Sequence, residues 1–293
     1  MIKLFESNNK LYQNIVKKYN ELSFHDMYGL IIPFSSKWKN IGINLSGGAD
    51  SACLTMLLCN IIKKNNYDCK IHIITHCRCW KTKPWQFPIS LKVYNKLKEK
   101  WPNIIGKRYK NYIPPEIEQT NAGSPFVDQK GEKQSGDNIE VDSFNMYIAY
   151  KGNLDATFNA TTLNPSNEEF ITKLILMGEE EPLKRSKTAE NGSVGNLLWK
   201  FNPHYECTPF VFIEKNVIMA FYDLYENLDL LNITRSCEGQ ITHHNINRKV
   251  KSLKNYSKNE NMEIPLCGDC YWCIEREWSI LNKDKCIDIM KNT

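Results

Sequence analysis

Alternation of apolar and polar positions in the first third of the chain predicts a strand, a helix and a second strand in succession. Residues Ile41–Leu45 are apolar at every second position, as expected for a buried strand. Apolar residues then recur with helical spacing from Ala49 to Lys64, and Ile71–Thr75 is again a short apolar run. This order is typical of a βαβ unit, in which a crossover helix joins two parallel strands.

The same patterns predict further helices and one further strand. The helices are expected over Leu91–Lys100, Ser143–Tyr150 and Lys215–Tyr225, and the strand over Ala156–Thr161. A short amphipathic helix is expected between residues 11 and 18. The chain is therefore predicted to be an α/β protein, with a parallel sheet flanked by helices.

Two polar segments are expected on the surface. Asn121–Asp142 is rich in Gly and Ser and follows the Pro114-Pro115 pair, so it is interpreted as a long loop. Such a loop acts either as a lid that becomes ordered around a substrate or as plain exposed chain, and both interpretations stay open. Glu179–Ser193 is charged and is expected to be exposed.

Composition narrows the class of protein without choosing a function. The chain has 293 residues, of which 42% are hydrophobic and 24% charged, and its formal net charge is +5. This balance suits one large domain, or one domain with an appendage. The sequence shows neither an apolar run of the roughly 18 residues that a membrane span requires nor a signal-peptide pattern. A cytoplasmic protein without a membrane partner is therefore expected.

The segment between the first strand and the first helix has the composition of an anion-binding turn. Its residues are Ser46, Gly47, Gly48, Ala49, Asp50 and Ser51. Neither the Walker phosphate loop nor the GxGxxG dinucleotide fingerprint occurs in the chain. Glycines let a backbone approach a ligand closely, and the free amides at a helix N-terminus attract phosphate. Asp50 fits a role beside a divalent cation or a role as a helix cap, and the turn itself could be only a tight connection.

Cysteines near the C-terminal end have the spacing of a metal site. Of the 11 cysteines, three follow one another at intervals of three residues: Cys267, Cys270 and Cys273. A closed zinc site needs a fourth ligand. Cys237 is favoured for that position, and the competitors are His243, His244 and Cys286. Ligation of an iron–sulfur cluster and three buried thiols without metal are the alternatives.

The turn and its preceding strand resemble the PP-loop ATP pyrophosphatase superfamily, whose hallmark is Ser-Gly-Gly-x-Asp-Ser after an apolar strand. This resemblance implies a Rossmann-like fold of the HUP type, in which residues 46–51 bind ATP together with Mg²⁺. It also implies an enzyme that adenylates a substrate and releases pyrophosphate.

The C-terminal part resembles one branch of that superfamily, the 7-cyano-7-deazaguanine (preQ0) synthases. The similar motifs are CGxCxxCxxR at 267–276, Thr-x-Ser-Cys at 234–237, and the segment 208–218 that contains Lys215. Val141 and Asn145 match parts of a further family segment. The resemblance implies a helical C-terminal region with a structural Zn²⁺. The implied zinc ligands are Cys237, Cys267, Cys270 and Cys273.

The chain departs from this family at positions that bear on the substrate. Where the family has Gly-Gln-Arg-His after the second strand, this chain has residues 75–80, Thr-His-Cys-Arg-Cys-Trp. Asp142 and Phe144 replace a Pro and an Arg of the family, while Arg235 and Glu238 replace a Trp and a Tyr. These changes bear on the identity of the substrate more than on the use of ATP.

The sequence thus predicts an N-terminal extension at 1–38, a PP-loop nucleotide-binding domain at 39–236 and a zinc-binding region at 237–293. The favoured function is adenylation of a 7-deazaguanine-like carboxylate by a ligase-type enzyme, with Asp50 and Lys215 as candidate catalytic residues and an amide or nitrile as product. The alternatives are thiolation of a tRNA base, using Cys77, Cys79 or Cys207, and a non-catalytic nucleotide- and zinc-binding module.

Partners beyond the purine-like substrate are less defined by the sequence. The segment 245–258 has five basic residues and no acidic ones, which fits either a solvated face or contact with tRNA or another nucleic acid. A homodimer is also compatible with the chain.

Overall fold

The structure of the protein, a computed structural model, describes residues 15–78, 86–113, 136–163, 165, 168, 170–172, 197–201, 203–237, 266, 268 and 270–292. Several sequence predictions fall outside these residues. They concern Cys79, Cys267, the charged segment 179–193, the basic segment 245–258 and the first part, 121–135, of the expected loop.

A six-stranded sheet forms the centre of the molecule, in the order β5-β4-β3-β6-β8-β7. The strands are β3 (Asn40–Asn44), β4 (Lys70–Arg78), β5 (Ile105–Ile113), β6 (Ala156–Phe158), β7 (Leu198–Phe201) and β8 (His204–Cys207). All neighbouring pairs are parallel except β7 and β8, which are antiparallel. The strand order runs from β3 to β4 and β5 on one side and to β6 and β8 on the other. The predicted Rossmann-like α/β fold is confirmed, and its topological switch point lies between β3 and β6.

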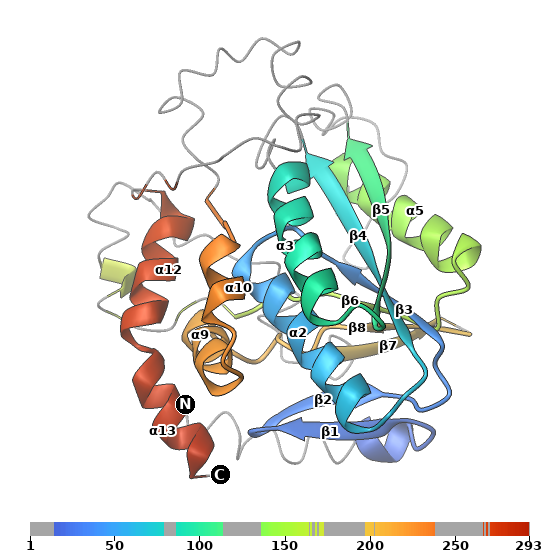
Figure 1. The fold of residues 1–293 in the computed structure, drawn as a ribbon, viewed down its shortest axis with the longest axis horizontal. Helices are drawn as coiled ribbons and strands as arrows, with labels where there is room; N and C mark the ends of the chain where they lie inside the picture. Colours follow the sequence, from blue (N-terminus) through green and yellow to red (C-terminus); the bar gives the residue numbers. More distant parts are fainter. Residues whose placement is uncertain are drawn as a thin grey trace.

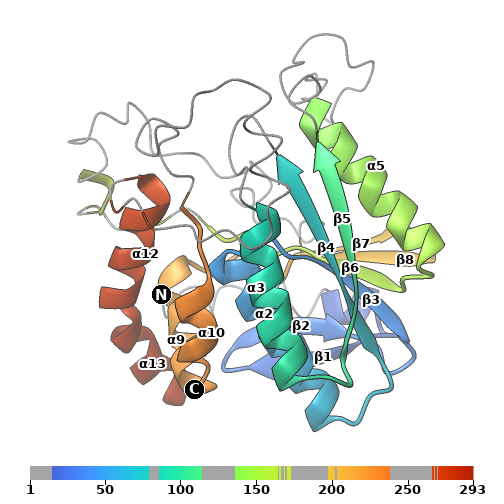
Figure 2. The same cartoon turned by 45° about the horizontal axis from the view of Figure 1, so that its top comes forward.

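Helices cover both faces of this sheet (Figures 1 and 2). On one face lie α2 (Ala49–Lys64) and α3 (Gln86–Lys100), and on the other lies α5 (Gly136–Lys151). The helices α9 (Lys215–Leu224), α10 (Leu228–Ile233), α12 (Tyr271–Leu281) and α13 (Lys283–Lys291) gather beside α2 (Figure 1). None of the described helices is both long and apolar enough to cross a membrane.

The N-terminal residues 15–38 pack on the core. The strands β1 (Ser23–Met27) and β2 (Leu30–Phe34) form an antiparallel hairpin. Phe34 is fully buried and stacks on Tyr67, with 5.3 Å between the ring centroids and 6° between the planes. Glu21 accepts hydrogen bonds from Lys200 and Tyr205. The region expected as an extension therefore contributes a hydrophobic layer to the domain, while the exact limits of the three predicted regions stay a prediction.

The predicted elements agree with the structure best where burial is greatest. Helix α2 has the expected bounds, and β3 is shifted by one residue. Residues 136–142 were expected to belong to a loop, which is wrong, because α5 begins at Gly136. This helix packs Ile148 against Ile74 and Leu154, and such packing stabilises helical turns whose own sequence is polar.

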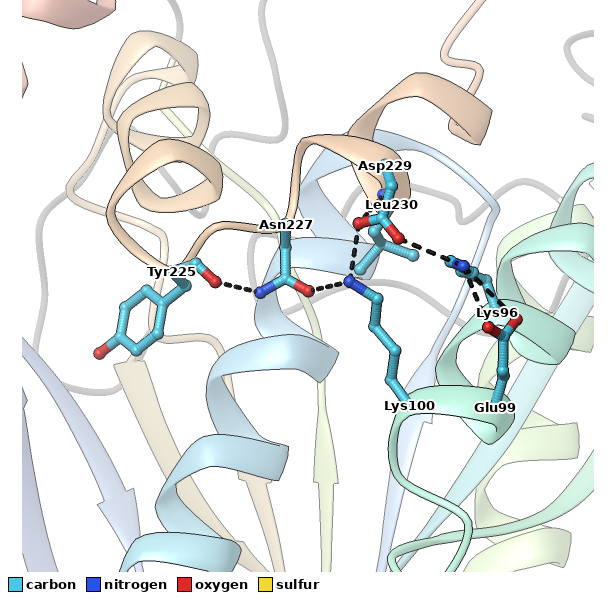
Figure 3. Close-up of polar contacts among 7 residues, drawn as sticks. All are labelled: Lys96, Glu99, Lys100, Tyr225, Asn227, Asp229 and Leu230. Carbon is cyan, nitrogen blue, oxygen red and sulfur yellow. Dashed lines mark hydrogen bonds and ion pairs between the residues drawn. The ribbon is translucent and has the colours of Figure 1, made fainter.

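A polar clamp joins the end of α3 to the start of α10 (Figure 3). The Lys100 ammonium donates to Asn227 Oδ1 and to Asp229 Oδ1, both at 2.7 Å, and Lys96 lies 3.2 Å from the other oxygen of Asp229. Burial raises the pKa of Asp229, but the bonds from Lys100 and Lys96 outweigh it and leave that pKa below its ordinary value. The clamp joins two helices near the turn at residues 46–51, since the start of α3 lies against Gly47 and the segment directly after α10 contacts the turn through Arg235.

Candidate nucleotide-binding site and metal centre

The turn at residues 46–51 lies at the carboxyl end of β3, next to the switch point of the sheet. Gly47 has a φ of +84°, and α2 begins at Ala49 with Gly48 as its N-cap and no side-chain cap. The first amides of α2 therefore have no side-chain acceptor at the cap, and they carry the partial positive charge of a helix N-terminus. The Ser46 and Ser51 hydroxyls lie 3.3 Å apart beside these amides. The turn thus has the left-handed glycine and the helix N-terminus on which the anion-binding prediction rests, and binding itself stays a prediction.

The two glycines of the turn have different environments. A Cβ on Gly47 would lie 2.5 Å from Ile89 Cγ2 and 2.8 Å from the backbone nitrogen of Ser90, both at the start of α3. A Cβ on Gly48 would lie 3.1 Å from Ser236 Oγ, and the backbone of Gly48 has an ordinary φ of −76°. Gly47 is therefore the residue that the turn requires for both conformation and space, since α3 packs directly on it.

Asp50 faces a buried lysine rather than capping its helix. Asp50 Oδ2 lies 3.2 Å from Lys215 Nζ, and the Lys215 side chain is 1% exposed. The other oxygen, Oδ1, is buried and has no hydrogen-bond partner among the described residues. A buried carboxylate oxygen without a donor suits a hard divalent cation, so this residue fits the Mg²⁺ that ATP would bring. The two predicted catalytic residues are thus in contact.

Glu275 is a third member of this buried group, and the sequence analysis missed it. Its carboxylate oxygen lies 2.8 Å from Lys215 Nζ, and its side chain is 0% exposed. The Lys215 ammonium also lies 5.2 Å from the centre of the Trp272 ring. Nothing local in the sequence marks Glu275, because its partner Lys215 starts a different helix 60 residues earlier (275 − 215).

The segment 234–237 lies against the turn at residues 46–51. The backbone nitrogen of Arg235 donates to Gly47 O at 3.0 Å. On its other side, Arg276 of α12 donates to Thr234 Oγ1 at 2.9 Å and to Leu231 O at 2.7 Å. Helix α9 adds a further support, since the Tyr222 hydroxyl donates to Ala49 O at 2.7 Å. The motif residues that the sequence analysis grouped with the zinc site therefore hold the turn as well.

The candidate metal centre brings together cysteines from two segments. The sulfur atoms of Cys237, Cys270 and Cys273 all lie within 4.8 Å of one another, and those of Cys237 and Cys270 are 3.9 Å apart. Tetrahedral ligation at a Zn–S distance of about 2.3 Å requires sulfur atoms about 3.8 Å apart, so these thiols fit such an ion. Cys286 is not part of the group and donates to Asn282 O instead. Thiolates also bind iron–sulfur clusters, so the donor set alone does not choose between the two metals.

Two of the three cysteines named for a thiolation chemistry, Cys77 and Cys207, are poorly placed for it. Cys207 is 0% exposed in β8, and burial raises the pKa of its thiol well above the ordinary value. Cys77 is also 0% exposed and packs against Phe87. A thiol that carries sulfur needs access and a low pKa, so neither residue has the properties of such a carrier.

Comparisons with known proteins add little to this site. No family model matches the chain, and no curated protein matches it. One similar solved structure is the U34-tRNA thiolase NcsA from Methanococcus maripaludis with its 4Fe-4S cluster: the TM-score is 0.40 and the identity 12%, over 89% of this chain and 82% of that chain.

A second similar structure is NAD+ synthetase from Burkholderia pseudomallei. Here the TM-score is 0.36 and the identity 10%, over 97% of this chain and 87% of that chain. Agreement at this level is too low to carry an activity from either protein to this chain. The site is therefore described by its own geometry: a glycine-containing turn at the switch point of a Rossmann-like sheet, beside a segment that also carries Cys237 of the cysteine cluster.

Proposed function

We propose that the protein is an ATP-dependent enzyme of the PP-loop type, which adenylates a carboxylate on a purine-like small molecule and releases pyrophosphate. The observation that carries the proposal is the turn at 46–51. Its left-handed Gly47 and the first amides of α2, which have no side-chain cap, lie at the switch point of the sheet and support phosphate binding there. Asp50 lies in the first turn of the same helix, and one of its oxygens is buried without a hydrogen-bond partner among the described residues.

In the proposed reaction, a carboxylate oxygen of the substrate attacks the α-phosphorus of ATP. The bond between that phosphorus and the bridging oxygen of the β-phosphate breaks, and pyrophosphate leaves with the bond electrons. The amides and hydroxyls of residues 46–51 would hold the leaving pyrophosphate, so their contribution is positioning and charge stabilisation. Mg²⁺, bound with ATP at Asp50, would offset the phosphate charge.

A second step would form the product. The nitrogen of ammonia attacks the acyl carbon of the adenylate, AMP leaves, and a proton is lost from the new amide. The amide oxygen would then attack the α-phosphorus of a second ATP and release pyrophosphate, and loss of AMP together with the two amide protons would leave a nitrile. The resemblance to preQ0 synthases is the reason for naming this chemistry and a 7-deazaguanine-like substrate.

Lys215 acts on this site through Asp50. Its ammonium lies 3.2 Å from Asp50 and 2.8 Å from Glu275, and its side chain is almost completely buried. Direct contact between Lys215 and phosphate would require the ammonium to leave one of these carboxylates. The proposed role is therefore to hold the Asp50 carboxylate in one orientation.

The metal would be structural. We assign it to Cys237, Cys270 and Cys273, with Cys267, which lies outside the described residues, as the fourth ligand. Four protein ligands leave no open position for a substrate, so Zn²⁺ would supply rigidity rather than chemistry. A homodimer, a cytoplasmic location and contact with nucleic acid through 245–258 stay predictions.

Thiolation of tRNA is the second candidate function, because the same activation step and the same cysteine cluster would serve it if the metal were iron. It is ranked lower here because Cys77 and Cys207 are buried. A non-catalytic module is ranked lowest, because the complete turn and the buried Asp50–Lys215–Glu275 group would then have no use.

The test is an incubation of the full chain with Mg–ATP, 7-carboxy-7-deazaguanine and ammonia, with pyrophosphate release and product mass as readouts. An amide or nitrile product is expected, and Asp50→Asn should abolish pyrophosphate release while Asp284→Asn on α13 should not. If substrate-dependent release is absent and sulfur enters tRNA in a parallel assay, thiolation replaces the proposal. If ATP does not bind, both enzymatic readings fail.

A further inference from the structure

A second group of polar side chains gathers at the carboxyl ends of the strands. We call it the carboxamide cluster, and its members are Asn44, His76, Asn111, Asn145 and Asn159. Asn44 ends β3, His76 lies in β4, Asn111 in β5 and Asn145 in α5, and Asn159 directly follows β6. Residues from distant parts of the chain thus meet at the switch point, where open α/β sheets bind their ligands. Asn44 is also only two residues before the turn at 46–51.

The hydrogen bonds of His76 define the orientation of the cluster. His76 Nε2 lies 3.2 Å from Asn44 Oδ1 and 3.0 Å from Asn145 Oδ1, whereas His76 Nδ1 lies 3.2 Å from Asn111 Nδ2. Two carbonyl oxygens face Nε2, so this nitrogen is the donor toward both of them, and an amide nitrogen faces Nδ1. The Asn44 and Asn145 carboxamides therefore both turn their oxygens toward the ring.

This arrangement leaves two amide donors directed away from the ring. Asn44 uses its Nδ2 to donate to Asn159 Oδ1 at 2.5 Å, so the Nδ2 of Asn159 is left over. The Nδ2 of Asn145 is left over in the same way, and neither group has an acceptor among the described residues. Asn145 is only 8% exposed. A donor on a side chain that is nine-tenths buried, with no acceptor among the described residues, is available to a ligand that supplies an acceptor.

The cluster has an aromatic ring on one side, and four of its five members are uncharged carboxamides. The Phe144 ring lies edge-to-face against His76, with 5.7 Å between the centroids and 82° between the planes. A carboxylate bound among the carboxamides would lose its hydration without gaining an opposite charge from them, whereas a neutral carbonyl oxygen or ring nitrogen would lose far less.

We propose that the carboxamide cluster binds the acceptor edge of an uncharged heterocyclic ring, with a ring carbonyl as its main contact. The inference rests on the proposed function, because this ring would belong to the substrate whose carboxylate is activated. The two ends of the substrate then bind to different groups because one end is charged and the other is neutral. The anionic end faces the turn at 46–51 and its cation, and the neutral ring faces the Nδ2 groups of Asn145 and Asn159.

The test compares two rings that differ at one position. 7-Deazaguanine presents a carbonyl oxygen at C6, and 7-deazaadenine presents an amino group there. Binding of each ring to the full chain is measured by calorimetry, in the presence of Mg²⁺ and a non-hydrolysable ATP analogue. The wild-type protein should bind the carbonyl ring about tenfold more tightly or better, because the amino ring would meet donors with donors.

The matched variants are Asn145→Asp and Asn153→Asp. In Asn145→Asp a carboxylate oxygen replaces the outward N–H₂ group, so the preference should move toward the amino ring by about tenfold or more. Asn153 lies exposed just beyond the end of α5, and its variant should keep the wild-type preference. A merely structural role of Asn145 would weaken both rings equally.

Three results would overturn the inference: no preference in the wild-type protein, an equal loss for both rings in Asn145→Asp, or no binding of either ring. Titration with Mg–ATP alone separates failure of this inference from failure of the proposed function. Asn145→Asp should leave the affinity for ATP within about threefold of wild type. Loss of ring discrimination with intact pyrophosphate release would remove the carboxamide cluster and keep the enzyme.

Discussion

Replacing Gly47 with Ala should damage the protein in two ways that the structure allows to be separated. The first is conformational, because a φ of +84° costs an L-residue about 1–2 kcal/mol. The second is steric, since the new Cβ would lie 2.5 Å from Ile89 Cγ2 and 2.8 Å from the backbone nitrogen of Ser90. Backbone shifts forced by such overlap cost about 1–3 kcal/mol. The free energy of unfolding should therefore fall by about 2–5 kcal/mol.

The chain offers a matched control for the conformational part. Gly268 has a φ of +86°, but a Cβ placed on it would meet no atom of the described residues within 4 Å. Gly268→Ala should therefore lose only the conformational part, about 1–2 kcal/mol. Gly48→Ala is the opposite control, because its φ is ordinary and its Cβ would come closest to two side-chain hydroxyl oxygens, at 3.1 Å and 3.3 Å.

Urea unfolding of the three variants, followed by tryptophan fluorescence, measures these differences, and calorimetry with Mg–ATP measures the effect on the turn. Gly47→Ala should weaken ATP binding by at least tenfold, because α3 and the turn cannot both keep their positions, whereas Gly268→Ala should not. If Gly47→Ala and Gly268→Ala lose the same stability, the packing of α3 on the turn does not constrain it, and the reasoning is refuted.

Three further predictions concern the groups around the turn. Glu275→Gln should lower the free energy of unfolding by about 1–3 kcal/mol, because it removes the charge that faces a buried ammonium, and urea unfolding should show no such loss for the exposed Glu277→Gln. Cys270→Ser should lose the bound metal in elemental analysis, whereas Cys286→Ser should retain it; equal metal contents would contradict the assignment. Hydrogen bonds from a lysine and a tyrosine lower the pKa of Glu21 from 4.5 to about 2, so the stability that Glu21→Gln removes should be full above pH 4.5 and should vanish as the pH falls toward 2.

The sequence predicts those parts of the fold in which most residues are buried, because their apolar pattern is then continuous along the element. Helix α2 is buried along most of its length and β3 lies in the middle of the sheet, so their apolar runs are continuous and readable. By contrast, β5 was not predicted. Its residues alternate irregularly between buried and exposed and include Lys107, Arg108 and Lys110, as suits a strand at the edge of the sheet.

The short strands β7 and β8 were missed for a related reason. Each has four residues, and they pair with one another at the other edge of the sheet, where a pattern has no room to repeat. The hairpin of β1 and β2 was also missed, although its turn at Tyr28 and Gly29 has positive φ at both positions. Short pairs are held by contacts with the rest of the molecule, and sequence patterns do not contain those contacts.

In the candidate site, too, groups that are close in the sequence could be predicted, and contacts between distant elements could not. The turn at 46–51 could be predicted as a candidate anion-binding site because its glycines and hydroxyls are close together in the sequence. The partners of that turn could not be predicted. Glu275, His76 and Asn159 each act with residues from another element, and only folding brings them together.

The segment 234–237 shows why the turn and the cysteine cluster are one structural unit. Cys237 belongs to the cluster, and two residues earlier the backbone nitrogen of Arg235 binds Gly47 O, although the two motifs are 190 residues apart (237 − 47). A metal that joins Cys237 to Cys270 and Cys273 would fix this segment to α12, the helix that also carries Glu275. The segment 234–237 and Glu275, which both support the turn, then depend on the position of α12. A structural metal is therefore a physically sufficient way to keep a nucleotide turn rigid without any contact between metal and nucleotide.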